Sequence, residues 1–128
     1  KYPDRVDKLA VTGAVLNSSA EALDDKVFEE IKHRLEELKD KTDPKSIEQR
    51  RLNQLMLDEP HINTESLKAI KVPTLVMAGD NDLVKDAHTR SIAANIPGSK
   101  LLIFKNATHY VPRENSAGFN KAVMNFLK

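Results

Sequence analysis

With 128 residues, the chain is long enough for one domain that buries about two-thirds of the surface exposed by its unfolded form. Its 20 basic and 19 acidic residues nearly cancel and are interleaved, which excludes the basic footprint of a nucleic-acid-binding protein, and no apolar run is long enough to cross a membrane. The absence of cysteine excludes disulfides and thiolate metal sites and favours a cytoplasmic location.

The first predicted element is a short buried strand at about residues 8–13. It is rich in β-branched residues and follows a turn at residues 2–4. From position 19 onward the apolar residues fall at spacings of three and four, which predicts an amphipathic helix over residues 20–39 with Ser18 or Ser19 as its N-cap. The residues of its apolar stripe are Leu23, Val27, Ile31, Leu35 and Leu38.

A second helix is predicted after the Asp-Pro pair at residues 43–44, because a capping carboxylate there directly precedes a proline suited to the first helical position. This helix should stop before Pro60. A short helix capped by Asn63 or Thr64 should follow, through residue 70. The apolar face of the second helix is formed by Ile47, Leu52, Leu55 and Met56.

The second half of the chain alternates strands with helices. A nearly continuous apolar run at residues 72–78 predicts a strand buried on both faces, as parallel strands are when helices cover a sheet on both sides. A helix at residues 84–96, a strand at residues 100–104 and a helix at residues 116–127 follow. This order predicts an α/β fold in which a parallel three-stranded sheet lies between two helical layers.

Two loops are candidate sites of chemistry, because each directly follows a strand of the predicted sheet. Residues 79–82 follow the second strand and include Asp82, and residues 106–112 follow the third strand and include His109. In a parallel sheet both loops leave at the carboxyl edge, where the active sites of open α/β sheets lie. A carboxylate on one loop could then hold one nitrogen of an imidazole on the other, leaving the second nitrogen to take a proton from a hydroxyl nucleophile.

The residues of these two loops resemble those of the α/β-hydrolases. The stretch at residues 70–82 is similar to the penultimate strand of that family and the turn that carries its catalytic acid. In the family pattern the acid stands three residues after the glycine, here Gly79, which selects Asp82 over Asp80. His109 resembles the catalytic histidine, and the two residues keep the family order of acid before base.

The resemblance extends over the whole chain and implies a division into two parts. Residues 1–18 and 71–128 correspond to the C-terminal part of a hydrolase core, and residues 19–70 occupy the place of a helical cap. The resemblance further implies hydrolysis of a small ester, amide or related bond by a Ser–Asp–His triad. It implies a small-molecule substrate, no cofactor and no metal ion.

The nucleophile of the family has no counterpart in the sequence. No Gly-x-Ser-x-Gly elbow occurs, and no serine lies at a predicted turn from strand to helix. The chain begins at Lys1 without a methionine, so a nucleophile-bearing segment could have been removed upstream. We therefore expect this chain to be the C-terminal half of a hydrolase and to be inactive alone, because loss of a triad serine can lower turnover by about 10⁶-fold.

Each candidate residue also has a simpler interpretation. Asp82 could cap the helix that starts near Val84, and Asp80 could be the acid or a solvated turn residue. Tyr110 and Val111 could line a pocket, and Tyr110 could equally be a packing residue. The histidines interpreted as surface or cap residues are His33, His61 and His88.

The alternative function is that of a non-catalytic interaction module or a pseudo-enzyme. Removing the half that precedes the first strand would expose one sheet edge and one apolar sheet face, and both favour association. We therefore expect a homo-oligomer of the isolated chain, formed by edge pairing or by exchange of helices.

Overall fold

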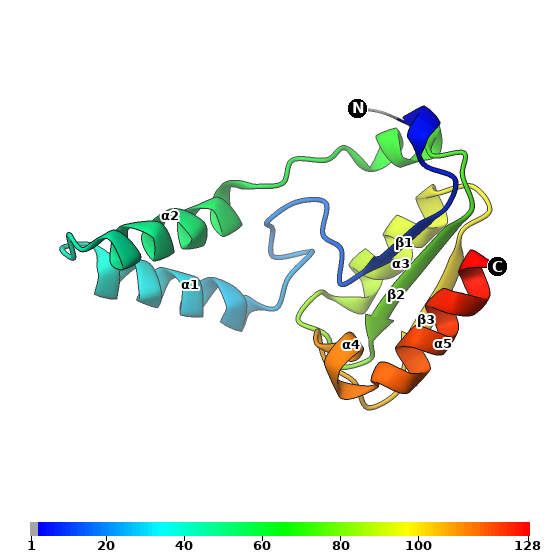
Figure 1. Cartoon of the computed structure of the whole chain (residues 1–128). Helices are drawn as coiled ribbons and strands as arrows, with labels where there is room; N and C mark the ends of the chain where they lie inside the picture. The colour runs from blue at the N-terminus through cyan, green and yellow to red at the C-terminus, as the bar shows by residue number, and fades with distance from the viewer. Residues whose placement is uncertain (1–2) are drawn as a thin grey trace.

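The computed structural model describes residues 3–128, so that the first position of the expected opening turn, residue 2, lies outside the described residues. Its centre is a sheet of three parallel strands in the order β1 (Leu9–Thr12), β2 (Thr74–Gly79) and β3 (Lys100–Phe104) (Figure 1). A short 3-10 helix, η1 (Pro3–Arg5), precedes β1. The predicted parallel α/β arrangement is confirmed, and the third strand has the predicted bounds.

The central strand, β2, is buried along its whole length. It pairs with β1 on one side, where Val11 lies opposite Val76, and with β3 on the other, where Val76 lies opposite Leu101. A strand that is apolar at nearly every position can exist only where both of its faces are covered. The outer edge of β1 pairs with no other strand among residues 3–128.

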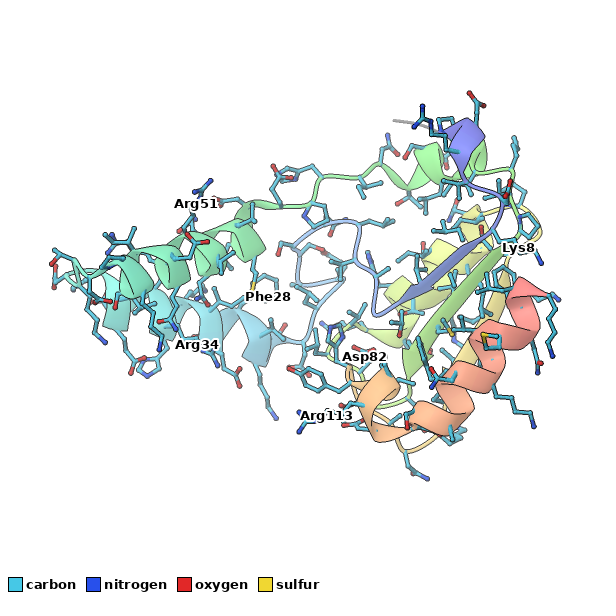
Figure 2. All side chains as sticks on the ribbon, viewed as in Figure 1. Lys8, Phe28, Arg34, Arg51, Asp82 and Arg113 are labelled. Atoms are coloured by element: carbon cyan, nitrogen blue, oxygen red, sulfur yellow. The ribbon has the colours of Figure 1, made fainter. Side chains whose placement is uncertain are left out.

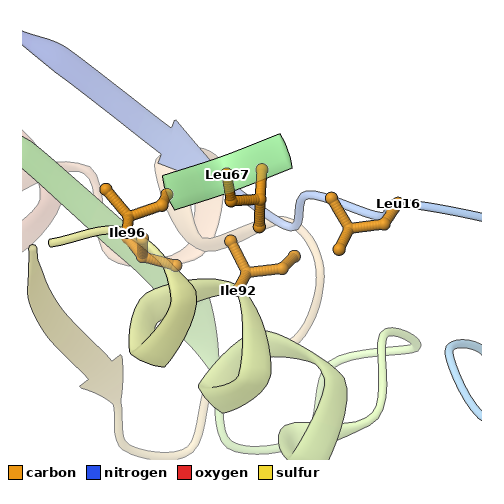
Figure 3. Packing of buried hydrophobic residues seen from close by; sticks show 5 residues of the cluster. Leu16, Leu67, Ile92 and Ile96 are labelled. Atoms are coloured by element: carbon orange, nitrogen blue, oxygen red, sulfur yellow. The ribbon is translucent and has the colours of Figure 1, made fainter. Parts of the chain in front are cut away.

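Helices cover the two faces of the sheet with separate apolar clusters. On one face, helix α3 (Asp86–Asn95) and the 3-10 helix η2 (Thr64–Ala69) pack on β2, with Leu67, Val76 and Ile92 at the centre of the contact (Figure 3). On the other face, helix α5 (Ser116–Leu127) contributes apolar side chains to a cluster around Met77 and Phe104. These three layers form the core that positions both strand-end loops.

The helices α1 (Asp25–Leu38) and α2 (Pro44–Asp58) form an antiparallel hairpin that projects away from the sheet (Figure 1). They pack chiefly against each other. The end of α2 before Pro60 and the capping of α2 by Asp43, with Pro44 in its first turn, are as predicted. Residues 19–70 include this hairpin, and its role as a cap stays a prediction.

The predicted start of the first helix is wrong. Its N-cap is Asp24 and not Ser18 or Ser19. Residues 22–24, directly before the helix, pair in extended form with the Asp82 loop: Leu23 bridges to Val84, and the backbone N–H of Asp24 donates to the carbonyl of Leu83. The helix can begin only after this contact has ended.

Two further helix details differ from the sequence interpretation. Helix α3 begins after Lys85, two residues later than expected, because residues 83–85 are engaged with the same extended segment. A short additional helix, α4 (Val111–Glu114), follows His109. Within residues 3–128, none of the helices combines the length and the apolar character needed to cross a bilayer.

Candidate active site

The two strand-end loops bring Asp82 and His109 into direct contact. The Oδ1 atom of Asp82 lies 2.8 Å from the Nδ1 atom of His109, although the residues are 27 positions apart in sequence. The Asp82 side chain is 2% exposed and the His109 side chain 33% exposed. Figure 2 shows Asp82 at the carboxyl end of the sheet, between the start of α1 and α4. The pair thus has a buried acid and an imidazole that solvent can reach.

Backbone hydrogen bonds join the two loops below this pair. The N–H of Asp80 donates to the carbonyl of Phe104 at 3.0 Å, and the N–H of Asn81 donates to the carbonyl of Ala107 at 3.0 Å. The loops approach so closely at Gly79 that a Cβ atom there would lie 2.1 Å from the carbonyl oxygen of Ala107. The glycine that ends β2 is therefore required for this approach.

Asp80 is an exposed turn residue, as interpreted, and it also joins the two loops. Its Oδ1 atom accepts a hydrogen bond from the N–H of Ala107 at 3.3 Å and another from the side chain of Asn81 at 3.0 Å. Its Oδ2 atom lies 3.7 Å from Nζ of Lys105. Among the described residues Asp80 contacts no imidazole, so Asp82 is the carboxylate that the fold presents to His109.

Asp82 does not cap helix α3, which was its simpler interpretation, because the N-cap of α3 is Lys85; it forms a local turn instead. The same Oδ1 atom that faces His109 accepts a hydrogen bond from the N–H of Val84 at 3.0 Å. Its Oδ2 atom is buried and has no hydrogen-bond partner among residues 3–128. The Oδ1 atom thus accepts the hydrogen bond that closes the turn and also contacts the histidine. The hydrogen bond of the turn fixes the orientation of the carboxylate.

The electrostatics of the pair favour its charged forms. Burial raises the pKa of the Asp82 carboxyl, but the hydrogen bond with His109 and the N–H of Val84 outweigh burial, so the pKa lies below its usual value. The hydrogen bond to Asp82 raises the pKa of His109 above its usual value, and burial of the ring opposes this only in part. A protonated imidazole is therefore stabilised at this position.

Gly13 makes room for the imidazole and was not identified from the sequence. It directly follows β1 and has a φ of 57°, in the left-handed region that favours glycine. A Cβ atom at this position would lie 2.5 Å from Cε1 and 2.7 Å from Nδ1 of His109. The available signal was a glycine at the carboxyl end of a strand next to the Asp82 strand.

Hydrogen bonds and buried side chains within the loop that carries His109 stabilise its conformation. The carboxylate of Glu114 accepts from both the N–H and the hydroxyl of Thr108, each at 2.7 Å. Ala107 and Val111 on either side of His109 are fully buried beneath α5. Val111 is therefore a core residue and not a pocket-lining one, whereas Tyr110 is 61% exposed and its ring meets the His109 ring edge-on at 5.8 Å.

The other histidines do not join this site. His88 is half-buried and its Nε2 atom accepts a hydrogen bond from the N–H of Leu16 at 3.1 Å, which corrects its interpretation as a surface residue. His33 and His61 are exposed. No group of three potential metal ligands occurs in the part of the chain that the structure describes.

No family model matches the chain, but relatives that match about half of it include hydrolases. It is 39% identical over 64 residues to a 2-hydroxy-6-oxononadienedioate/2-hydroxy-6-oxononatrienedioate hydrolase of Pseudomonas putida. The matched segment covers 48% of this chain and 22% of that protein. It is also 36% identical over 64 residues to a proline iminopeptidase of Saccharolobus solfataricus. This matched segment covers 50% of this chain and 21% of that protein.

The solved structures extend the likeness to the whole chain. The enol-lactonase of Burkholderia xenovorans matches with a TM-score of 0.69 at 20% identity, over 99% of this chain and 58% of that one. The chain carries part of the α/β-hydrolase fold. It spans about a fifth of the length of the curated relatives above and little more than half of the enol-lactonase.

Proposed function

We propose that the chain supplies the acid and the base of a serine-type α/β-hydrolase that acts on a small ester, amide or related bond. In this proposal Asp82 is the acid and His109 the base, and the nucleophile is a serine on a segment outside these 128 residues. The observation that carries the proposal is the 2.8 Å contact between a buried carboxylate and a half-exposed imidazole at the carboxyl edge of a parallel sheet.

The proton route follows from this contact. An ionised carboxylate only accepts hydrogen bonds, so Asp82 holds the His109 tautomer that carries its proton on Nδ1. The Nε2 atom forms no hydrogen bond with residues 3–128 and keeps a lone pair that can take the proton of a serine hydroxyl. As His109 becomes charged, Asp82 stabilises the imidazolium.

The same proton then leaves with the product. His109 donates it to the departing alcohol or amine as the acyl group transfers to the serine. A water molecule next gives a proton to His109 while its oxygen bonds to the acyl carbon. His109 then returns that proton to the serine oxygen as the bond between serine and the acyl group breaks. The raised pKa of His109 supports its role as a general base, because the stabilised imidazolium makes it easier for the ring to take a proton.

The chain alone is expected to be inactive, because none of its own hydroxyl groups in residues 3–128 forms a hydrogen bond with His109. The test compares the isolated chain with a longer protein that contains it, using a panel of small esters and amides and labelling by a fluorophosphonate. We expect labelling and turnover only in the longer protein. Absence of both in the longer protein would refute the proposal.

Substitutions in the longer protein test the proposed roles of Asp82 as the acid and His109 as the base. We expect His109→Gln to lower kcat by about 10⁴- to 10⁶-fold and Asp82→Asn by about 10⁴-fold. His33→Gln, on the exposed side of α1, is the matched control and should leave kcat unchanged. Equal activity of the His109 variant and the parent would show that the imidazole is not the base.

A further inference from the structure

The face of α2 that is turned away from α1 carries an uncovered apolar strip. Leu52 and Leu55 on this strip are 49% and 52% exposed, respectively. The predicted apolar face of this helix is therefore only about half covered by the rest of residues 3–128. A shallow groove of about 520 Å³ lies along the face and is lined by Glu48, Arg51, Leu52, Gln54, Leu55 and Asp58.

Charged side chains stand at the two ends of the strip. Arg51 and Asp58 are both exposed, and Figure 2 shows Arg51 pointing away from α1. Arg51 forms no ion pair within the part of the chain that the structure describes, and Asp58 is held by hydrogen bonds of 3.0 and 3.1 Å from the side chain of Gln54. One end of the groove thus carries Arg51 together with the exposed Glu48, and the other end carries Asp58.

The spacing of these charges is self-complementary. Residues seven apart on a helix lie on the same face, about 10 Å apart along its axis. If two α2 helices lie antiparallel about a two-fold axis midway between Arg51 and Asp58, each arginine faces the aspartate of the other copy. The same axis passes beside Leu55, so the apolar residues of both copies meet between the two charge pairs.

We propose that this face of α2 is a docking surface for a second copy of the chain, in an antiparallel helix pair closed by two reciprocal Arg51–Asp58 ion pairs. The inference goes beyond the proposed hydrolytic function and does not depend on it. A helix of 15 residues is about 22 Å long, so the contact buries less surface than a standard-size interface. The dimer is therefore weak and depends on protein concentration.

The experiment is sedimentation of the full 128-residue chain over a wide range of concentrations, at low salt. We expect a reversible dimer in the parent chain. Arg51→Glu alone or Asp58→Arg alone places like charges opposite each other at both ends of the contact and should weaken dimerisation at least about tenfold. Both positions are exposed, so circular dichroism should show an unchanged fold.

Mixing provides the deciding measurement. In an equimolar mixture of the two single variants, each new acidic side chain faces a new basic one, so a heterodimer of about parental strength should form. The double variant, Arg51→Glu with Asp58→Arg, should also dimerise. Arg34→Glu, on the exposed side of α1, is the matched control and should dimerise like the parent.

Two outcomes would overturn the proposal. A chain that stays monomeric at millimolar concentration has no such surface for its own copy, and the strip would then serve another partner. A dimer whose strength neither single variant changes lies elsewhere, for example at the unpaired outer edge of β1.

Discussion

Three residues determine how His109 is placed. Asp82 binds its Nδ1 atom, Gly13 leaves the space that its ring fills, and Glu114 fixes the backbone of Thr108 directly before it. The ring is thereby oriented before any substrate binds, which is what a general base requires.

We predict that Asp82→Asn lowers the pKa of His109. The hydrogen bond and charge of Asp82 raise this pKa, and the amide removes the charge, so the imidazolium loses its stabilisation. Titration of the His109 ring resonances by NMR between pH 4 and pH 9 measures the change. His88, which does not contact Asp82, should titrate as in the parent. An unchanged His109 titration would mean that the 2.8 Å contact is absent in solution.

We predict that Gly13→Ala disturbs the pair while Gly98→Ala does not. Both glycines have positive φ values, 57° and 73°, so alanine costs about 1–2 kcal/mol of backbone strain at either position. Only at Gly13 would the new methyl group also collide with His109, whereas nothing lies within 4 Å at Gly98. Urea unfolding and the His109 resonances measure the two effects. Equal behaviour of both variants would contradict the predicted collision.

The hairpin of α1 and α2 is closed by one arginine. Arg50 of α2 donates from Nη1 to the carbonyls of Leu38 and Lys39 at 2.9 and 2.8 Å, and to that of Lys41 at 3.3 Å. These carbonyls lie at the end of α1, whose last turn contains no basic residue of its own. A cation from the neighbouring helix thus satisfies the exposed carbonyls and the negative end of the helix dipole.

We predict that Arg50→Met loosens the end of α1 by about 1–2 kcal/mol, because carbonyls that bind a cation lose their partner. Hydrogen exchange of the α1 amides, read residue by residue, is the measurement, and exchange should accelerate mainly near Leu38. Arg51→Met, one residue further along the same helix and exposed, is the control. If both substitutions accelerate exchange equally, the carbonyl contacts of Arg50 contribute no stability.

At the scale of the whole molecule, His88 ties the α3 layer to the loop after β1. Its Nε2 atom accepts from the N–H of Leu16, whose side chain is part of the core on that face of the sheet. Burial lowers the pKa of His88 below its usual value. The acceptor role requires a neutral ring, so burial and the hydrogen bond favour the same protonation state.

We predict that His88 makes the fold less stable as the pH falls. Its folded-state pKa is lowered, so below about pH 6.5 the unfolded chain binds a proton that the folded chain resists, and stability is lost. His109 acts oppositely: its raised pKa adds stability that is present below about pH 6.5 and lost as the pH rises through its folded value. The His88 contribution must therefore be isolated by substitution.

Urea unfolding of the parent and of the His88→Leu variant isolates the contribution of His88 to the free energy of unfolding. At pH 7.5 the variant should be less stable by about 1–3 kcal/mol, because the N–H of Leu16 loses its acceptor. The difference should shrink at pH 5.5. His61→Leu, at an exposed position, is the control. A difference that does not depend on pH would show that the pKa of His88 is the same in the folded and the unfolded chain.

Helices and strands followed from the sequence wherever the signal was local. The apolar run of β2, the Asp-Pro start of α2 and the strand β3 depend only on neighbouring residues. The start of α2 and the bounds of β3 are as expected, and β2 begins two residues later than its apolar run. The start of α1 was misplaced because residues 22–24 pair with the Asp82 loop, some 60 residues away. That contact could not be inferred from periodicity.

The sequence by itself determined the order of strands and helices, the parallel sheet and the meeting of the Asp82 and His109 loops, because the carboxyl ends of neighbouring parallel strands must share one edge. Only the tertiary structure decided which residues surround the imidazole and which face of α2 stays uncovered. Gly13 lies 96 residues before His109, and no local pattern specifies how two such distant segments pack. Periodicity identifies apolar residues, but the packing of the whole chain determines which of them are buried.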